Sequence, residues 1–102
     1  MRRVPDWVRQ NKLPPGAVPG SVLFAKIGCL NCHTYVGDGN AVAGAPDLTK
    51  EGLKGRGMRW QIRHLDCPGC LVSGSAMPSF TALGPARIRR LATFLEASRG
   101  GK

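Results

Sequence analysis

The sequence predicts a mostly α-helical fold, and three observations support this. Residues 56–65 and residues 85–95 carry apolar side chains at the three- and four-residue spacing of one helix face. An apolar run at residues 22–27 follows Ser21, a residue type that caps helices. No segment alternates apolar and polar residues like a half-buried strand, and no repeat is visible. The 102 residues are enough for one small domain.

The elements follow in order along the chain. Residues 1–20 hold four of the eight prolines, so we expect an extended arm or linker there, with the domain itself spanning residues 21–102. The first helix begins at Ser21. A glycine-rich loop then runs from Gly37 to Pro46. The second helix covers residues 56–65, and a Pro- and Gly-rich loop follows it. The last helix begins at Gly84-Pro85, because proline is tolerated in a first helical turn. It ends before Gly100-Gly101.

The run Cys29-Leu30-Asn31-Cys32-His33, at the end of the first helix, is typical of a c-type haem attachment site. Two thiols three positions apart can each bond one vinyl group of the macrocycle, and the adjacent imidazole can bind the iron. A soft sixth ligand is available in the segment Ser75–Phe80, where Met77 lies 44 residues after His33. Pro78 favours an extended conformation at Met77, which suits a ligand presented by a loop. We therefore expect one covalently bound haem c with His33 and Met77 as its axial ligands.

Together these motifs resemble the class I cytochrome c family over roughly residues 20–98. The resemblance implies a cytochrome c-like fold in which the terminal helices cross around the haem. It also implies that the Pro46 carbonyl accepts a hydrogen bond from His33, and that Trp60 donates to a haem propionate. The function it implies is one-electron transfer, as a carrier and not an enzyme, in a respiratory chain.

One departure from the family pattern is Cys67-Pro68-Gly69-Cys70, a second Cys-x-x-Cys that Leu71 follows in place of histidine. A short disulfide is the expected explanation, and a redox-active dithiol is the alternative.

The sequence is compatible with two other functions. Four cysteines, Cys29, Cys32, Cys67 and Cys70, are the ligand set of a zinc-binding interaction module, although 34 residues separate the two pairs. A haem sensor or enzyme with an open sixth position is the second alternative.

The net charge of +9, with ten arginines among 15 basic residues, predicts an acidic partner. We expect an acidic redox protein or a respiratory complex, with membrane association through a larger assembly as a further option. No nucleic acid partner is expected, because the basic residues are dispersed and form no recognised module. The family implies an extracytoplasmic location, at the periplasm or the outer face of the cytoplasmic membrane, although no signal peptide is visible.

Overall fold

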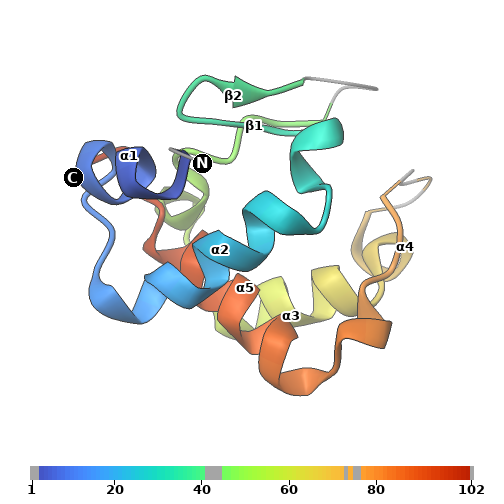
Figure 1. The fold of residues 1–102 in the computed structure, drawn as a ribbon. Coiled ribbons are helices and arrows are strands. Elements are labelled where there is room, and N and C mark those ends of the chain that lie inside the picture. The colour runs from blue at the N-terminus through green and yellow to red at the C-terminus, as the bar shows by residue number, and fades with distance from the viewer. Residues whose placement is uncertain (1–2, 41–44, 73, 75–76, 102) are drawn as a thin grey trace.

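The structure is a computed structural model that describes residues 3–40, 45–72, 74 and 77–101 (Figure 1). These residues form the α-helices α1 (Arg3–Gln10), α2 (Val18–Lys26), α3 (Met58–Asp66), α4 (Pro68–Leu71) and α5 (Pro85–Ala97). Four short 3-10 helices join them: η1 (Pro15–Ala17), η2 (Cys29–Asn31), η3 (Glu51–Lys54) and η4 (Thr81–Leu83). The predicted mostly α fold class is confirmed.

A short hairpin was not expected from the sequence. Strands β1 (Thr34–Tyr35) and β2 (Asp38–Gly39) pair antiparallel, with Thr34 opposite Gly39 and Tyr35 opposite Asp38. Two residues are too few to show an alternating pattern. Val36 and Gly37 form the turn between the strands. Both have positive φ, as a tight two-residue hairpin turn requires.

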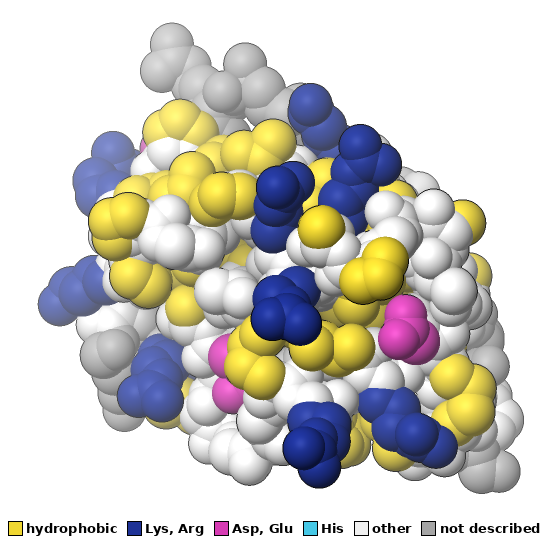
Figure 2. All heavy atoms as spheres, turned by 90° about the horizontal axis from the view of Figure 1, so that it is seen from below, with side chains coloured by type: hydrophobic (Ala, Val, Ile, Leu, Met, Phe, Trp, Pro, Cys, Tyr) yellow, Lys and Arg dark blue, Asp and Glu magenta, His cyan; other side chains and the backbone are white. Residues whose placement is uncertain are grey.

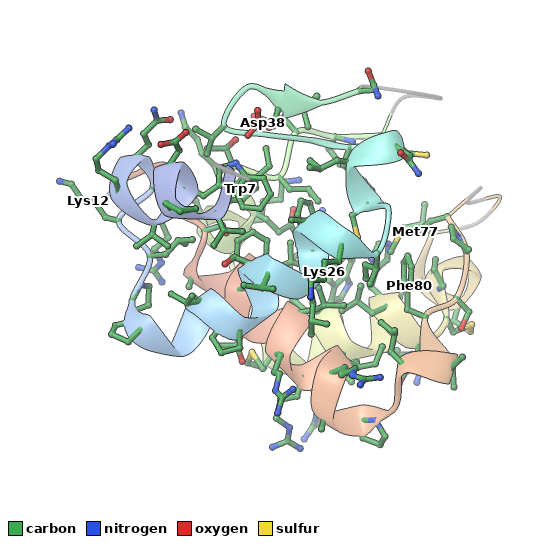
Figure 3. All side chains as sticks on the ribbon, in the orientation of Figure 1. Trp7, Lys12, Lys26, Asp38, Met77 and Phe80 are labelled. Atoms are coloured by element: carbon green, nitrogen blue, oxygen red, sulfur yellow. A yellow bond between two sulfur atoms is a disulfide. The ribbon has the colours of Figure 1, made fainter. Side chains whose placement is uncertain are left out.

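Helix α1, η1 and the start of α2 at Val18 correct two expectations, namely the extended arm over residues 1–20 and a first helix that begins at Ser21. Arg3–Gln10 is helical although it contains Pro5, because proline is tolerated in a first turn. The Trp7 side chain is fully buried and packs edge-on against Phe24 and Tyr35 and in a stacked arrangement on Phe94. Its indole Nε1 donates to Asp38 Oδ2 at 2.8 Å (Figure 3). Burial of this large aromatic side chain draws the N-terminal segment into the core.

Helices α2 and α5 lie against each other in the centre of the molecule (Figure 1). Their contact is so close that a Cβ atom at Gly20 would collide with the backbone oxygen of Arg90 and would lie 2.7 Å from Phe94 Cβ. Only glycine fits at this point. The first predicted helix and the last therefore pack together, whereas their crossing around a haem remains a prediction.

Helix α3 packs on the same α5 and begins two residues later than expected, at Met58. Helix α5 begins at Pro85 as predicted, and it ends at Ala97, before the two glycines at 100 and 101. Both α2 and α3 are thus anchored on one helix, and this fixes the positions of the segments that follow them.

Candidate functional site

The Cys29–His33 motif folds as a tight turn directly after α2. Gly28 has a φ of 91°, which lets the chain leave the helix, and η2 begins at Cys29. The amide N–H of His33 donates to the Cys29 carbonyl oxygen at 2.9 Å, and that of Cys32 donates to the same oxygen at 3.3 Å. This turn keeps both thiols and the imidazole within one short segment.

The two thiols of this motif are not bonded to each other. Cys29 is buried and Cys32 is exposed. Burial raises the pKa of the Cys29 thiol to about 12, and the nearby Cys32 contributes to the increase. Cys29 therefore remains protonated at neutral pH, as a thiol.

The His33 imidazole is held from one side. Its Nδ1 lies 2.9 Å from the carbonyl oxygen of Pro46, and because a carbonyl only accepts, Nδ1 must carry the proton. In the neutral imidazole the other ring nitrogen, Nε2, then carries the lone pair, and this is the form that binds a metal. The arrangement has the geometry that the family resemblance implied for His33 and Pro46.

Residues after Pro46 fix that carbonyl in place. The Thr34 carbonyl accepts from the Leu48 amide at 2.8 Å, and Thr34 Oγ1 donates to Asp47 Oδ1 at 3.1 Å. The chain after Pro46 is thereby tied to the residue after His33. This clamp was not predicted, since its only sequence signal is a pair of small polar residues.

Met77 lies on the loop between α4 and η4, half-buried and packed against the hydrophobic core. Its neighbours Ser75 and Ala76 lie outside the described residues. Figure 3 shows Met77 and Phe80 on the side of this loop that faces the rest of the molecule. The loop is tied to the end of α3 by a hydrogen bond from the Phe80 amide to the Leu65 carbonyl at 2.9 Å.

A second tie joins the same loop to the next residue of α3. Ser79 Oγ donates to the Asp66 carbonyl oxygen at 2.5 Å, and Thr81 Oγ1 donates to it at 3.1 Å. The end of α3 therefore determines where the loop that carries Met77 sits.

Trp60, the predicted propionate donor, is half-buried on α3 and stacks on His64 with ring centroids 4.7 Å apart and an interplanar angle of 11°. The Arg56 guanidinium lies over the Trp60 ring at 4.1 Å, a cation–π contact. Desolvation lowers the pKa of His64, and the charges of Arg56 and His33 lower it further, against the opposing effect of Glu51.

A buried polar cluster, which no sequence pattern predicted, supports this stack. Gln61 Nε2 donates to Glu51 Oε2 at 2.9 Å and to Glu96 Oε1 at 3.0 Å. Glu51 is 4% exposed and also pairs with Lys54 at 3.0 Å and with Arg56 at 3.3 Å. The cluster joins η3, α3 and α5, and it holds the guanidinium that covers Trp60.

The second Cys-x-x-Cys lies at the start of α4. The sulfur atoms of Cys67 and Cys70 lie at bonding distance, with their Cα atoms 5.4 Å apart. Among the described residues, which include all four cysteines, no three or more His, Cys, Asp or Glu side chains are grouped as a metal site requires. The zinc alternative needs such a group and finds no support.

The residues present fit a c-type haem by the chemistry of their donors. Two unpaired thiols three positions apart precede an imidazole that already has one nitrogen engaged. A half-buried thioether stands on a separate loop. This is the donor set that thioether attachment with His/Met ligation needs.

Comparison with known proteins gives one family match. Residues 16–95 match the family described as cytochrome C oxidase, cbb3-type, subunit III, and this range is more than half of the chain. No significant match was found among curated proteins or among solved structures. None of the helices in the described segments combines the length and the apolar character needed to cross a membrane.

Proposed function

The chain belongs to the cbb3-type cytochrome c oxidase subunit III family, a class I cytochrome c-like family whose function is haem c electron transfer, and we propose that it is a one-electron carrier with His/Met ligation. The observation that carries this proposal is the His33–Pro46 hydrogen bond next to two unpaired cysteines. This hydrogen bond orients the imidazole and leaves its other nitrogen to bind a metal, close in sequence to the thiols that would anchor the porphyrin.

Each residue has a distinct part in this proposal. Cys29 and Cys32 would hold one haem c through thioether bonds, and His33 and Met77 would be its axial ligands. When bound, the haem supplies reversible one-electron chemistry at its iron. The Pro46 carbonyl keeps the His33 ring oriented and makes it a stronger ligand. If His33 and Met77 both bind the iron, no position would be left for a substrate, which favours a carrier over an enzyme.

Trp60 would donate its indole N–H to a propionate. The stack of Arg56, Trp60 and His64 supports this role, because it places one aromatic N–H and one cation side by side at α3. A Trp60→Phe variant keeps an aromatic ring at this position and removes the N–H donor. We expect it to shift the reduction potential while the axial ligands remain bound.

The test of the axial ligands is an absorption spectrum of the oxidised protein. Sulfur bound to ferric iron gives a weak near-infrared band, and Met77→Ala should abolish it. Met58→Ala is the matched control, since Met58 is 37% exposed and lies on α3. A band that survives in Met77→Ala would disprove the ligand assignment. Ready binding of carbon monoxide to the reduced wild-type protein would favour an open sixth position instead.

The covalent attachment is tested by mass spectrometry of the native polypeptide. A mass increase of one haem, lost when Cys29 and Cys32 are both replaced by serine, is expected. A colourless protein of unmodified mass would overturn the proposal altogether.

The proposed partner is an acidic redox protein or a respiratory complex on the extracytoplasmic side. The family name supports a respiratory complex, and the net charge of +9 supports an acidic docking surface. Docking of this kind is steered by charge, so the rate of electron transfer to such a partner should fall as salt is added. A rate independent of salt would argue against it.

A further inference from the structure

The second cysteine pair stands in a basic groove that the electron-transfer proposal does not use. The groove lies along α3, reaches α5 and has a volume of about 650 Å³. Both cysteines line it, together with three arginines and one carboxylate, namely Arg59, Arg63, Arg89 and Asp66. Figure 2, which looks at the molecule from the side of α3 and α5, shows basic side chains standing among hydrophobic ones on this face.

The arginines of this groove are available to a ligand. All three are exposed, and within the part of the chain that the structure describes none of them forms an ion pair. Three positive charges against the single charge of Asp66 leave the groove positive. A small anion is therefore attracted to the same space that the two sulfur atoms share.

The two sulfur atoms differ in access. Cys70 is exposed, whereas Cys67 is half-buried. An incoming thiolate therefore meets Cys70 first, and Cys67 is the leaving group. Positive charges around the site also stabilise the thiolate that leaves, which speeds exchange.

From this groove, its charge and the exposed sulfur, we infer that the Cys67–Cys70 disulfide is a thiol–disulfide exchange site selective for small anionic thiols, such as thiols that carry a carboxylate. The thiolate sulfur bonds to Cys70 Sγ, the bond between Cys70 and Cys67 breaks, and its electron pair leaves on Cys67 Sγ. A second thiol then attacks the mixed disulfide and releases Cys70. Overall two external thiols are oxidised to one disulfide, and Cys67 and Cys70 gain their two electrons and two protons.

The test compares an anionic with a cationic thiol on the native holoprotein. Mercaptoacetate and cysteamine are allowed to react at low ionic strength, and the freed thiols are alkylated and located by mass spectrometry of the Cys67–Cys70 peptide. The ratio of the two rates is divided by the same ratio in urea-unfolded protein, which removes the intrinsic reactivity of the thiols. We expect a corrected preference of about tenfold for mercaptoacetate, at the low end of electrostatic steering.

The variant that decides the question is R59Q/R63Q/R89Q, in which the corrected preference should fall to about one. R9Q/R87Q/R99Q removes the same charge outside the groove and should keep most of the preference. A native disulfide that does not react, a wild-type preference equal to that of the unfolded chain, or a groove variant that keeps its preference would each overturn the inference.

Two precautions keep the test decisive. If the groove variant loses its helical circular dichroism, a salt titration of the wild type decides, because added salt must slow the reaction with mercaptoacetate. A rate that salt leaves unchanged would overturn the inference. The readout does not depend on haem attachment, because the peptide that contains Cys29 and Cys32 is analysed separately from the Cys67–Cys70 peptide.

Discussion

The contact between α2 and α5 at Gly20 makes the sharpest prediction about the fold. In Gly20→Ala the new methyl group would collide with the Arg90 carbonyl oxygen and lie 2.7 Å from Phe94 Cβ. These neighbours are a backbone atom and a Cβ, neither of which can rotate away, so the two helices must move apart. Overpacking of this kind costs about 1–3 kcal/mol.

Part of that cost is offset because alanine is the better helix former, by about 0.5–1 kcal/mol. We therefore expect Gly20→Ala to lower the free energy of unfolding by about 1 kcal/mol. For a domain of this size the loss corresponds to a fall of roughly 5 °C in melting temperature. Because α2 ends at Lys26, just before Cys29, the displaced helix would also disturb the Cys29–His33 turn.

Gly16→Ala is the matched control. Gly16 has ordinary φ, and a Cβ added there would meet no atom within 4 Å, so the same chemical change should be neutral or stabilising by about 0.4–1 kcal/mol. Urea unfolding followed by far-ultraviolet circular dichroism measures both variants. If Gly20→Ala proves as stable as Gly16→Ala, the close approach of α2 and α5 is wrong.

Three further predictions concern other parts of the molecule. Trp7→Phe should lower the free energy of unfolding by about 1–3 kcal/mol, because it removes the indole hydrogen bond to Asp38 and leaves that carboxylate short of a partner; an unchanged urea midpoint would mean that α1 is a loose arm after all. Burial raises the pKa of Tyr35 above its ordinary value of 10.0, so the unfolded chain ionises first and the free energy of unfolding should decline as pH rises past 10. Tyr35→Phe should lessen that decline, and an identical pH profile for the two proteins would contradict the assignment. Ser79→Ala removes the hydrogen bond to the Asp66 carbonyl, so the near-infrared sulfur band should be lost at a lower temperature than in wild type, and an equal temperature would show that this tie does not hold the ligand loop.

The helical part of the fold was predictable because its signals are local. The apolar stripe of α5 and its Gly84-Pro85 start are contained in one segment, so the sequence alone places the helix start correctly. The cysteine motif is also local. Its five residues fold as one turn, and the spacing of its donors is set within that turn.

The features that could not be predicted depend on contacts between distant residues. The prolines of the N-terminal segment indicate an irregular chain, yet Trp7 finds its partners at Phe24, Tyr35 and Phe94, and that burial outweighs local preference. The same holds for the buried cluster around Gln61. Its partners come from η3 and α5, and no local pattern indicates that two of the few acidic side chains meet there.

The two Cys-x-x-Cys segments show why spacing alone does not determine the chemistry of a cysteine pair. In the first, the chain turns through η2, Cys29 is buried while Cys32 is exposed, and the two thiols stay apart. In the second, Pro68 starts a short helix that brings the sulfur atoms of Cys67 and Cys70 together on the surface.

The residue after each cysteine pair determines whether a side chain that can bind iron stands next to the two sulfur atoms. His33 follows the first, with one nitrogen engaged by a backbone carbonyl and the other left for a metal. Leu71 follows the second, which offers no ligand and leaves only sulfur chemistry. Exchanging the two residues, with Leu at 33 and His at 71, should therefore abolish His ligation without creating a second haem site, because Cys67 and Cys70 already consume each other's thiols. Haem bound covalently to Cys67 and Cys70 in that variant would contradict this. It would show that the position of the histidine, and not the disulfide between the two sulfur atoms, determines whether the second motif binds haem.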